Sequence, residues 1–585
     1  MTRKQCQSAA WGKRLLMMCA VILSSSLVFA GSPKMSKDLE GKNPSDLVDV
    51  IVQFKQAPSQ MHFSKVQGRG GLLKRQLGLV KGGAFRLPAS ALKELANDPD
   101  VAYIAPDRPL YSTSDGSPTA VLDYHTDTVN APLAWTKGLT GAGVGVAVID
   151  SGMIDINDFH SQNSNRVVFG QNFVGGISGS ANDQYGHGSH VAGIIGGNGN
   201  NSTGSNYFYT FKGIAPNVNL IDLRVLDQNG AGTDSQVIAA IQMAIQLKST
   251  YNIRVINLSL GRPVYESYTL DPLCQAVEQA WKAGIVVVVA AGNQGRNNSA
   301  STSGYGTITA PGNDPYVITV GAMKTMGTAN RADDQIASYS SKGPTLYDHV
   351  VKPDLVAPGN RIISVYAQGL TMDQLYPLNE ISTWLYQSNG NSTASDTYYV
   401  LSGTSMAAPM VSGAAALLLQ KSPSLTPDQV KARLMKTAYK NIVTYSTAVD
   451  PVTGQTYNSQ ADIFTVGAGY LDIQAALANT DLATATTGSA LSPTVTQDKA
   501  GNTVLVNGTS VVWGKSVVWG TAVVWGTSVV WGTDISGQSV LWGSSVCWGT
   551  SALQGYSVVW GTSVVWGQSS TPAGEATAIA INGEN

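Results

Sequence analysis

The sequence predicts an α/β fold in which helices cover both faces of a parallel sheet, giving three layers. Apolar runs typical of buried strands alternate with helical segments between residues 144 and 320, and repeated strand-helix-strand units form parallel sheets. A short segment with strand and helix patterns precedes this core, and a Trp-Gly repeat rich in β-branched residues follows it. We therefore expect an α/β core between a small α+β unit and a β-rich repeat tail.

Length and composition exclude several classes of protein. A chain of 585 residues is too long for one compact core, so two or more domains with processed segments are expected. Charged residues make up 13% and the net charge is −1, which argues against a nucleic acid or an anionic membrane as partner. Two of the four cysteines fall in the leader and Cys274 and Cys547 lie in unlike segments, so no disulfide framework is expected.

Residues 1–30 have the pattern of a secretory signal peptide. Basic residues precede an apolar run at 15–23, and small residues around Ala30 suit cleavage after that position. A retained membrane anchor is the alternative, but the run is shorter than the ~20 residues that a span needs. The protein is therefore expected to be exported, to the medium or the cell surface.

Residues 31–118 form the predicted α+β unit. Strands are expected at 46–55 and 101–107 and a helix at 90–97, and the polar stretch 111–118 suits an exposed linker. Such a unit could be an independent binding module or a segment that is removed on maturation.

The core, assigned to residues 119–480, alternates strands and helices. The helix at 233–248 begins with Thr233 and Gln236 at the spacing of a capping box. The predicted strands are 144–152, 218–226, 254–261, 284–293 and 316–320, and the other predicted helices are 186–196 and 274–283.

Two polar residues stand where such a sheet places functional groups. Asp150 ends the first buried strand, and ligands gather at the carboxyl ends of strands in open α/β sheets, although a turn or cap residue is the alternative. His187 opens the next small-residue helix. His190 lies three residues on, which could suggest zinc, but no third ligand with suitable spacing follows and we interpret His190 as structural.

Ser405 lies in residues 403–409, Gly-Thr-Ser-Met-Ala-Ala-Pro, ahead of an Ala- and Leu-rich stretch. A helix is predicted to start near Ser405, and unpaired N–H groups at a helix N-terminus stabilise negative charge beside the hydroxyl. An ordinary serine in a glycine-rich loop is the alternative interpretation.

The order Asp150, His187, Ser405 narrows the chemistry. Serine needs a histidine to remove its proton, and the histidine needs a carboxylate to fix its tautomer. Trypsin-like enzymes have the order His, Asp, Ser, and α/β-hydrolases place the serine in a Gly-x-Ser-x-Gly elbow that is absent here. Together with residues 150–152, 187–193 and 403–409, this order resembles the subtilisin-like serine proteases (subtilases) of the secreted bacterial type, over roughly residues 133–478.

The resemblance implies roles for nine residues. Ser405 would be the nucleophile, His187 the general base and acid, and Asp150 the orienting carboxylate. Asn293 would donate to the oxyanion with the backbone N–H of Ser405. The substrate-binding residues implied by the resemblance are Ser259, Leu260 and Gly261 along the substrate edge, and Ala291 and Gly292 at the pocket before the scissile bond.

The resemblance also implies that a propeptide is cleaved off, and it raises the question of a calcium site. Residues 31–118 would be a propeptide that assists folding and acts as an intramolecular inhibitor until it is cleaved at 111–118. No cofactor is needed for the chemistry. Structural calcium, known from many relatives near the long loop 198–211, is compatible with side-chain and backbone oxygens but cannot be assigned to a site. Residues 368–397 are polar and interpreted as an insertion beside the cleft.

The tail comprises a linker at 481–506, Trp-Gly repeats at 507–567 and a flexible C-terminus at 568–585. Tryptophans recur mostly six residues apart, so in extended chain they share one face. Short stacked strands are predicted, with a disordered tail as the alternative. We hypothesise a surface-attachment or carbohydrate-facing module, which would contact the cell surface or a polysaccharide.

Two functions follow from these patterns. The first is a secreted serine endopeptidase that acts on polypeptides through an acyl-enzyme and is made as a self-processed zymogen. The second is an adhesive surface protein that retains a protease fold without activity. The complete set of Asp150, His187, Asn293 and Ser405 favours the enzyme.

Overall fold

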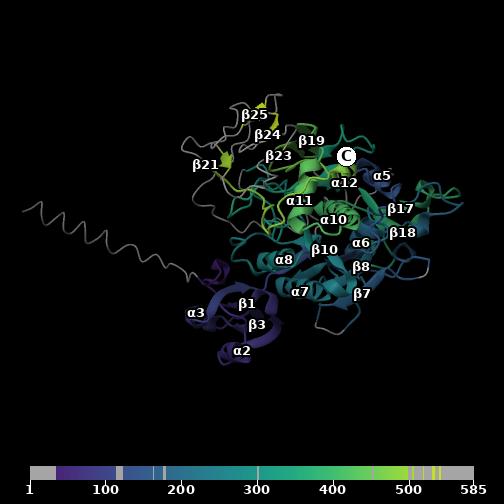
Figure 1. Ribbon diagram of the computed structural model, residues 1–585. Coiled ribbons are helices and arrows are strands. Elements are labelled where there is room, and N and C mark those ends of the chain that lie inside the picture. The colour runs from purple at the N-terminus through teal and green to yellow at the C-terminus, as the bar shows by residue number, and fades with distance from the viewer. Residues whose placement is uncertain are drawn as a thin grey trace, which may run out of the picture.

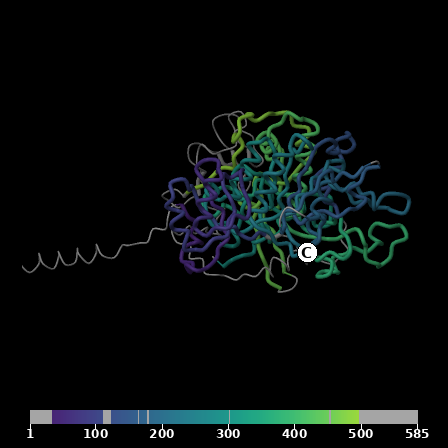
Figure 2. Tube along the Cα trace, turned by 90° about the horizontal axis from the view of Figure 1, so that it is seen from below, coloured from purple at the N-terminus to yellow at the C-terminus, as the bar shows by residue number. Residues whose placement is uncertain are grey.

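The computed structural model describes residues 34–112, 123–162, 164–175, 179–299, 302–450 and 454–497, with a few short strands beyond them. The predicted signal peptide, most of the predicted linker at 111–118 and most of the Trp-Gly repeats lie outside the described residues. We call residues 34–112 the N-terminal unit and residues 123–497 the main unit. The N-terminal unit lies at the edge of the molecule in both views (Figure 1, Figure 2).

The main unit confirms the predicted α/β fold class. Its central sheet has the strand order β14-β13-β12-β10-β6-β8-β7, with β15 also paired to β13, and all pairs except β13 with β14 are parallel. The strands are β6 (Gly145–Asp150), β7 (Val167–Asn172), β8 (Asn219–Arg224), β10 (Ile253–Leu258), β12 (Val286–Ala290), β13 (Ile318–Lys324), β14 (Gln335–Ile336) and β15 (Leu355–Pro358). Every residue of β6, β12 and β13 is buried, as their apolar runs predict.

Helices pack on both faces of this sheet (Figure 1). On one face lie α6 (His187–Gly196) and α10 (Thr404–Lys421), and their alanines and glycines allow close approach to each other and to the strands. On the other lie α7 (Asp234–Tyr251) and α8 (Pro272–Lys282). The capping box predicted for Thr233 and Gln236 is confirmed at the start of α7.

The remaining helices and strands of the main unit lie outside the central sheet and the four helices described above. The helices are α4 (His125–Thr128), α5 (Ala131–Trp135), α9 (Thr371–Leu375), α11 (Pro427–Thr437) and α12 (Ile473–Ala478). The strands are β9 (Ala231–Thr233), β11 (Leu260–Gly261), β16 (Ile362–Val365), β17 (Glu380–Ser382), β18 (Ala394–Leu401), β19 (Tyr445–Val449) and β20 (Thr456–Gln460). None of the helices in the described part of the chain has the length and hydropathy that a membrane span needs.

The N-terminal unit is a four-stranded antiparallel sheet of order β2-β3-β1-β4. It comprises β1 (Leu47–Phe54), α2 (Gln60–Gln67), β2 (Leu72–Leu77), β3 (Gly82–Pro88), α3 (Leu92–Asn97) and β4 (Val101–Pro106). It has its own apolar core, and β2 and the turn after it contact α7 and α8 of the main unit. A last strand, β5 (Pro109–Ser112), leaves this sheet and joins the main unit.

Beyond residue 494 the structure describes only short strands. These are β21 (Val495–Gln497), β22 (Thr503–Leu505), β23 (Val518–Trp519), β24 (Val530–Thr533) and β25 (Ser539–Leu541). β23 and β24 run parallel with Trp519 opposite Trp531, two repeats apart. This pairing agrees with short stacked strands for the few repeat residues that are described.

Candidate active site

Asp150 and His187 meet at the carboxyl edge of the sheet. Asp150 is the last residue of β6 and His187 the first of α6, and the Nδ1 of His187 lies 2.6 Å from Oδ1 of Asp150. Both side chains are buried. The backbone N–H of Ser151 also donates to Asp150 Oδ1, at 2.8 Å. A proton on Nδ1 is therefore directed at the carboxylate, which leaves Nε2 as the nitrogen that can accept one.

Ser405 is the second residue of α10, close to the predicted helix start. Its Oγ donates to the carbonyl oxygen of Ser259 at 3.0 Å, and the Oγ of Ser259 donates back to the carbonyl of Ser405 at 2.8 Å. His187 Nε2 is buried and has no hydrogen-bond partner among the described residues, so the expected serine-histidine hydrogen bond is not formed. The helices α6 and α10, which carry the two residues near their N-termini, pack against each other. Such bonds are often long until a substrate binds.

Asn293 follows β12 and is oriented by Thr404, the neighbour of Ser405. The Oδ1 of Asn293 accepts from the backbone N–H and from the Oγ1 of Thr404, both at 2.9 Å. Because the amide oxygen is held in this way, the amide nitrogen is the group that Asn293 can present as a donor. An uncharged donor beside the serine is suited to an oxyanion.

The predicted substrate edge is occupied by the chain itself. β5 lies antiparallel between β11 and β9, with Tyr111 opposite Gly261 and Ser112 opposite Leu260 on one side. On the other side, Leu110 is opposite Gly232. Leu110 is fully buried and belongs to the core of the main unit. The partner strand β9 was not expected from the sequence, because Ala-Gly-Thr carries no strand signal.

The predicted pocket residues lie beside the serine. The N–H of Gly292 donates to Thr404 Oγ1 at 3.1 Å, and the carbonyl of Ala291 accepts from Thr309 N at 3.0 Å. Gly292 has φ +104, and a Cβ there would lie 2.7 Å from the side chain of Thr309. Both the backbone conformation and the space therefore require glycine.

Asp183 is a buried carboxylate beside the site that was not predicted from the sequence. Its carboxylate accepts from Ser151 Oγ, from the N–H groups of Tyr185 and Gly186, and from both the N–H and Oγ of Ser189, at 2.7–2.9 Å. These bonds fix the loop that leads into His187. A carboxylate four residues before a histidine at a helix N-terminus was the available signal.

His190 is structural, as predicted. Its Nε2 faces the carbonyl oxygens of Ile362 and Tyr399, each at 3.1 Å. Burial, with His187 nearby, lowers the pKa of His190 to about 3, so the ring is neutral. The two histidines therefore face different partners, and no group of three or more metal-binding side chains occurs among the described residues.

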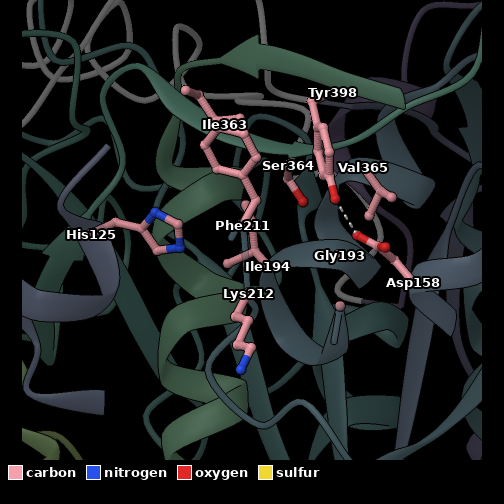
Figure 3. A pocket seen from close by; sticks show the side chains of 11 residues that line it. His125, Asp158, Gly193, Ile194, Phe211, Lys212, Ile363, Ser364, Val365 and Tyr398 are labelled. Carbon is pink, nitrogen blue, oxygen red and sulfur yellow. Dashed lines mark hydrogen bonds between the residues drawn. The ribbon is translucent and has the colours of Figure 1, made fainter. Parts of the chain in front are cut away.

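The cavity beside the long loop 198–211 does not fit a calcium ion. Asp158 is its buried carboxylate, and its Oδ1 accepts from Asn201 N at 2.7 Å while Oδ2 accepts from the hydroxyl of Tyr398 at 2.9 Å. Figure 3 shows this bond on one side of Phe211 and His125 on the other. Hydrogen-bond donors thus occupy the oxygens that a cation would need.

The predicted insertion 368–397 lies beside the histidine loop. Thr371 and Met372 donate their N–H groups to the carbonyls of Gln184 and Tyr185, at 3.1 and 2.9 Å. A Cβ on Gly186 would lie 3.5 Å from Leu370 and Met372. The insertion therefore supports the residues that precede His187.

Comparison with known proteins agrees with this geometry. The model of the subtilase family matches residues 141–469. Serine protease AprX of Bacillus subtilis is 38% identical over 322 residues, covering 54% of this chain and 66% of its own. Subtilisin E of Bacillus subtilis is 34% identical over 424 residues, covering 72% of this chain and 92% of its own.

Two further relatives extend the comparison. An extracellular serine proteinase of Thermus sp. is 36% identical over 366 residues, covering 62% of this chain and 72% of its own. Among solved structures, fervidolysin from Fervidobacterium pennivorans, described as a keratinolytic enzyme related to subtilisin, matches with a TM-score of 0.56. The match spans 80% of this chain and 66% of the fervidolysin chain at 22% identity. This likeness therefore concerns the fold alone.

Proposed function

Because this chain belongs to the subtilase family, we propose that Asp150, His187 and Ser405 are its catalytic triad. It is a subtilisin-like serine endopeptidase, a hydrolase that acts on polypeptides and needs no cofactor for its chemistry. The observation that carries the triad is the 2.6 Å contact between Asp150 and His187 at the sheet edge where α10 presents Ser405.

In the proposed reaction, the same groups act first in acylation of Ser405 and again in hydrolysis of the acyl-enzyme. Nε2 of His187 removes the proton of Ser405 as Oγ attacks the peptide carbonyl, and Asp150 stabilises the imidazolium. The amide nitrogen of Asn293 and the N–H of Ser405 stabilise the oxyanion. His187 then gives its proton to the leaving amine, and water repeats the sequence to hydrolyse the acyl-enzyme. For this, Ser405 Oγ must turn from the Ser259 carbonyl towards Nε2.

We propose that substrates bind as an added strand at β11, through Ser259, Leu260 and Gly261, with Ala291 and Gly292 beside the residue that precedes the cut. The support is β5, whose backbone pairs with β11 and β9 on this edge. Calcium is not part of the proposal, because each carboxylate oxygen of Asp158 already accepts a hydrogen bond and no group of three or more metal-binding side chains occurs among the described residues.

We propose further that the protein is a secreted, self-processed zymogen. Residues 1–30 would be a signal peptide, and residues 31–118 a propeptide that inhibits the enzyme by keeping β5 in the substrate edge. The extracellular serine proteinase among the relatives supports export. The N-terminal unit has an apolar core of its own, which supports its release as one piece, and it buries Ile51, Leu77, Val80 and Ala84 against the main unit.

Active-site labelling tests the catalytic assignment. A fluorophosphonate probe should label the processed protein, and Ser405→Ala should abolish labelling. His187→Ala should block self-cleavage and leave a precursor roughly 90 residues longer than the active form, a span set by the linker predicted at 111–118. Correctly processed protein that takes no label would favour the adhesive surface protein, and mature-sized product from His187→Ala in a protease-free host would contradict self-processing.

The Trp-Gly repeats at 507–567 are proposed to be a surface-attachment or carbohydrate-facing module. Their support is compositional, because a row of aromatic side chains can stack on sugars. Deletion from Asn507 onward should reduce binding to cells and polysaccharide while peptide hydrolysis is kept. Unchanged binding would contradict attachment.

A further inference from the structure

Glu266, just after β11, is a buried acid that the proposed reaction does not use. Its carboxylate is 6% exposed and accepts from the hydroxyl of Tyr103 at 2.5 Å and from Nη1 of Arg108 at 2.7 Å. Both donors belong to the N-terminal unit. Among the described residues these are the only side chains that hydrogen-bond to Glu266, so both partners leave with that unit.

The main unit contributes an aromatic ring as well as the acid. The guanidinium of Arg108 lies 4.9 Å from the centre of the Tyr265 ring while it binds Glu266. Its other partners, Ser36 and Asp38, belong to the N-terminal unit. A carboxylate beside an aromatic face is an arrangement that binds guanidinium groups.

The neighbouring Arg262 does not satisfy this acid. Its guanidinium binds Asp234 at 2.9 Å and Asp271 at 2.7 Å, and all three side chains are buried in the main unit. These bonds do not depend on the N-terminal unit. Glu266 therefore loses its cationic partner when that unit departs.

The position of Arg108 corresponds to a defined position in a substrate. Arg108 directly precedes β5, three residues before Tyr111, which is opposite Gly261. β5 runs along β11 towards Ser259, whose carbonyl contacts the Oγ of Ser405. A polypeptide bound in the same register places a side chain beside Glu266.

We propose that Glu266 and Tyr265 form a subsite of the mature enzyme that binds an arginine of a polypeptide substrate, and lysine more weakly. The arginine lies three residues before the substrate residue opposite Gly261. The inference rests on the proposal that β5 occupies the path of a substrate. It makes a side chain outside the proposed triad and oxyanion site a determinant of specificity.

Two internally quenched peptides test the subsite. One copies residues 106–118, and the other replaces the residue equivalent to Arg108 by glutamine. The mature wild-type enzyme should cleave the arginine peptide with a kcat/KM about tenfold higher, as expected for a charge-assisted hydrogen bond. Glu266→Gln should cleave both peptides alike. Glu278→Gln, which removes an acid paired with Lys282 on α8, is the matched control and should keep the preference.

The comparison of the two peptides on the wild-type enzyme needs no variant to fold. Equal kcat/KM for both peptides would overturn the subsite and leave the protease assignment intact. Loss of the preference in Glu278→Gln as well would also overturn it, because the effect would then reflect net charge. Failure to cleave either peptide, with no fluorophosphonate labelling, would overturn the protease assignment and the subsite together.

Discussion

Asp183 shows how a residue away from the reacting atoms can set their geometry. Its carboxylate joins Ser151, next to Asp150, to the loop and first turn that carry His187. The two members of the Asp-His pair come from different elements, and Asp183 connects both elements at once. The relative position of Asp150 and His187 therefore depends on the carboxylate of Asp183.

Asp183→Ala is expected to lower kcat by about 10- to 100-fold, because small displacements of a catalytic group are that costly. KM should change little, since β11 and β9 are untouched. Steady-state hydrolysis of a peptide measures both constants. Asp155→Ala, at an exposed carboxylate that pairs with His160, is the control and should leave both constants unchanged. An equal loss in the control, or a change in KM alone, would contradict the positioning role.

The residues that the sequence could identify are those whose neighbours in the chain carry the signal. Asp150, His187, Asn293 and Ser405 each stand in a distinctive local stretch. Glu266 acts through partners from a distant segment, such as Arg108, and Asp183 joins its own loop to the distant Ser151. Nothing in the residues adjacent to them reports those partners. The sequence also did not show that Ser405 Oγ donates to the carbonyl of Ser259, a partner from a distant segment, and not to His187.

At the scale of elements, residues 483–494 differ from the rest of the predicted linker because they hydrogen-bond to buried groups of the main unit. The hydroxyl of Ser492 donates to Asp354 at 2.5 Å and accepts from Lys431 at 2.8 Å. Lys352, Asp354 and Lys431 form a fully buried group of charges. Further bonds join Ala490 N to Asp428 at 2.8 Å, and Gln429 to the carbonyl of Ala483 at 2.9 Å. Residues 483–494, which we call the strap, therefore supply hydrogen-bond partners to buried polar groups of the main unit.

Truncation separates the strap from the tail. A chain ending at residue 497 should keep the unfolding temperature of the same chain ending at 506. A chain ending at 482 should lose several buried hydrogen bonds worth about 1 kcal/mol each and unfold at a clearly lower temperature. Calorimetry on Ser405→Ala versions avoids self-digestion. Equal unfolding temperatures for the 482 and 497 chains would show that the strap is not part of the folded unit.

The elements that the sequence predicted well are those whose residues are all buried. β6, β12 and β13 are buried on both faces, so their apolar runs are unambiguous. β7 is half-buried except for the exposed Gly170, and the three residues of β9 pair with β5. Their conformation comes from contacts with other segments, which a local pattern does not contain.

At the scale of the whole molecule, Asp107 connects the two units. Its carboxylate accepts from the N–H and the Oγ of Ser235, at 2.8 and 2.6 Å, in the first turn of α7. Burial, opposed by the hydrogen bonds from Ser235, raises the pKa of Asp107 above its ordinary value. Release of the N-terminal unit returns this carboxyl to water and to an ordinary pKa.

The raised pKa of Asp107 determines whether assembly of the two units weakens or strengthens as pH rises. The contribution of Asp107 to assembly is complete below the ordinary pKa of ~4 and is lost as pH rises through the raised value. After self-cleavage, the fraction of N-terminal unit that co-elutes with the main unit should therefore fall as pH rises from about 4. Size-exclusion chromatography with a serine-protease inhibitor measures it. Asp107→Asn should flatten this dependence, and an unchanged slope in that variant would contradict the role of Asp107.

The sequence predicted that a small α+β unit precedes the core, because each has its own hydrophobic pattern. It did not predict how the two sit together. That arrangement depends on polar groups such as Asp107 and Glu266, which carry no periodicity, and on the backbone of β5, which carries no side-chain signal.

Under the proposed self-cleavage, the three-stranded sheet β11-β5-β9 would make hydrolysis and disassembly separate events. Severing the chain beyond Ser112 breaks one covalent link but none of the backbone bonds, the buried Leu110 contact or the Arg108 ion pair. After cleavage, β5 would therefore still occupy the substrate edge. The onset of activity is then timed by how slowly a bound fragment escapes or is destroyed, so that mutations at the interface would alter the delay without touching the chemistry.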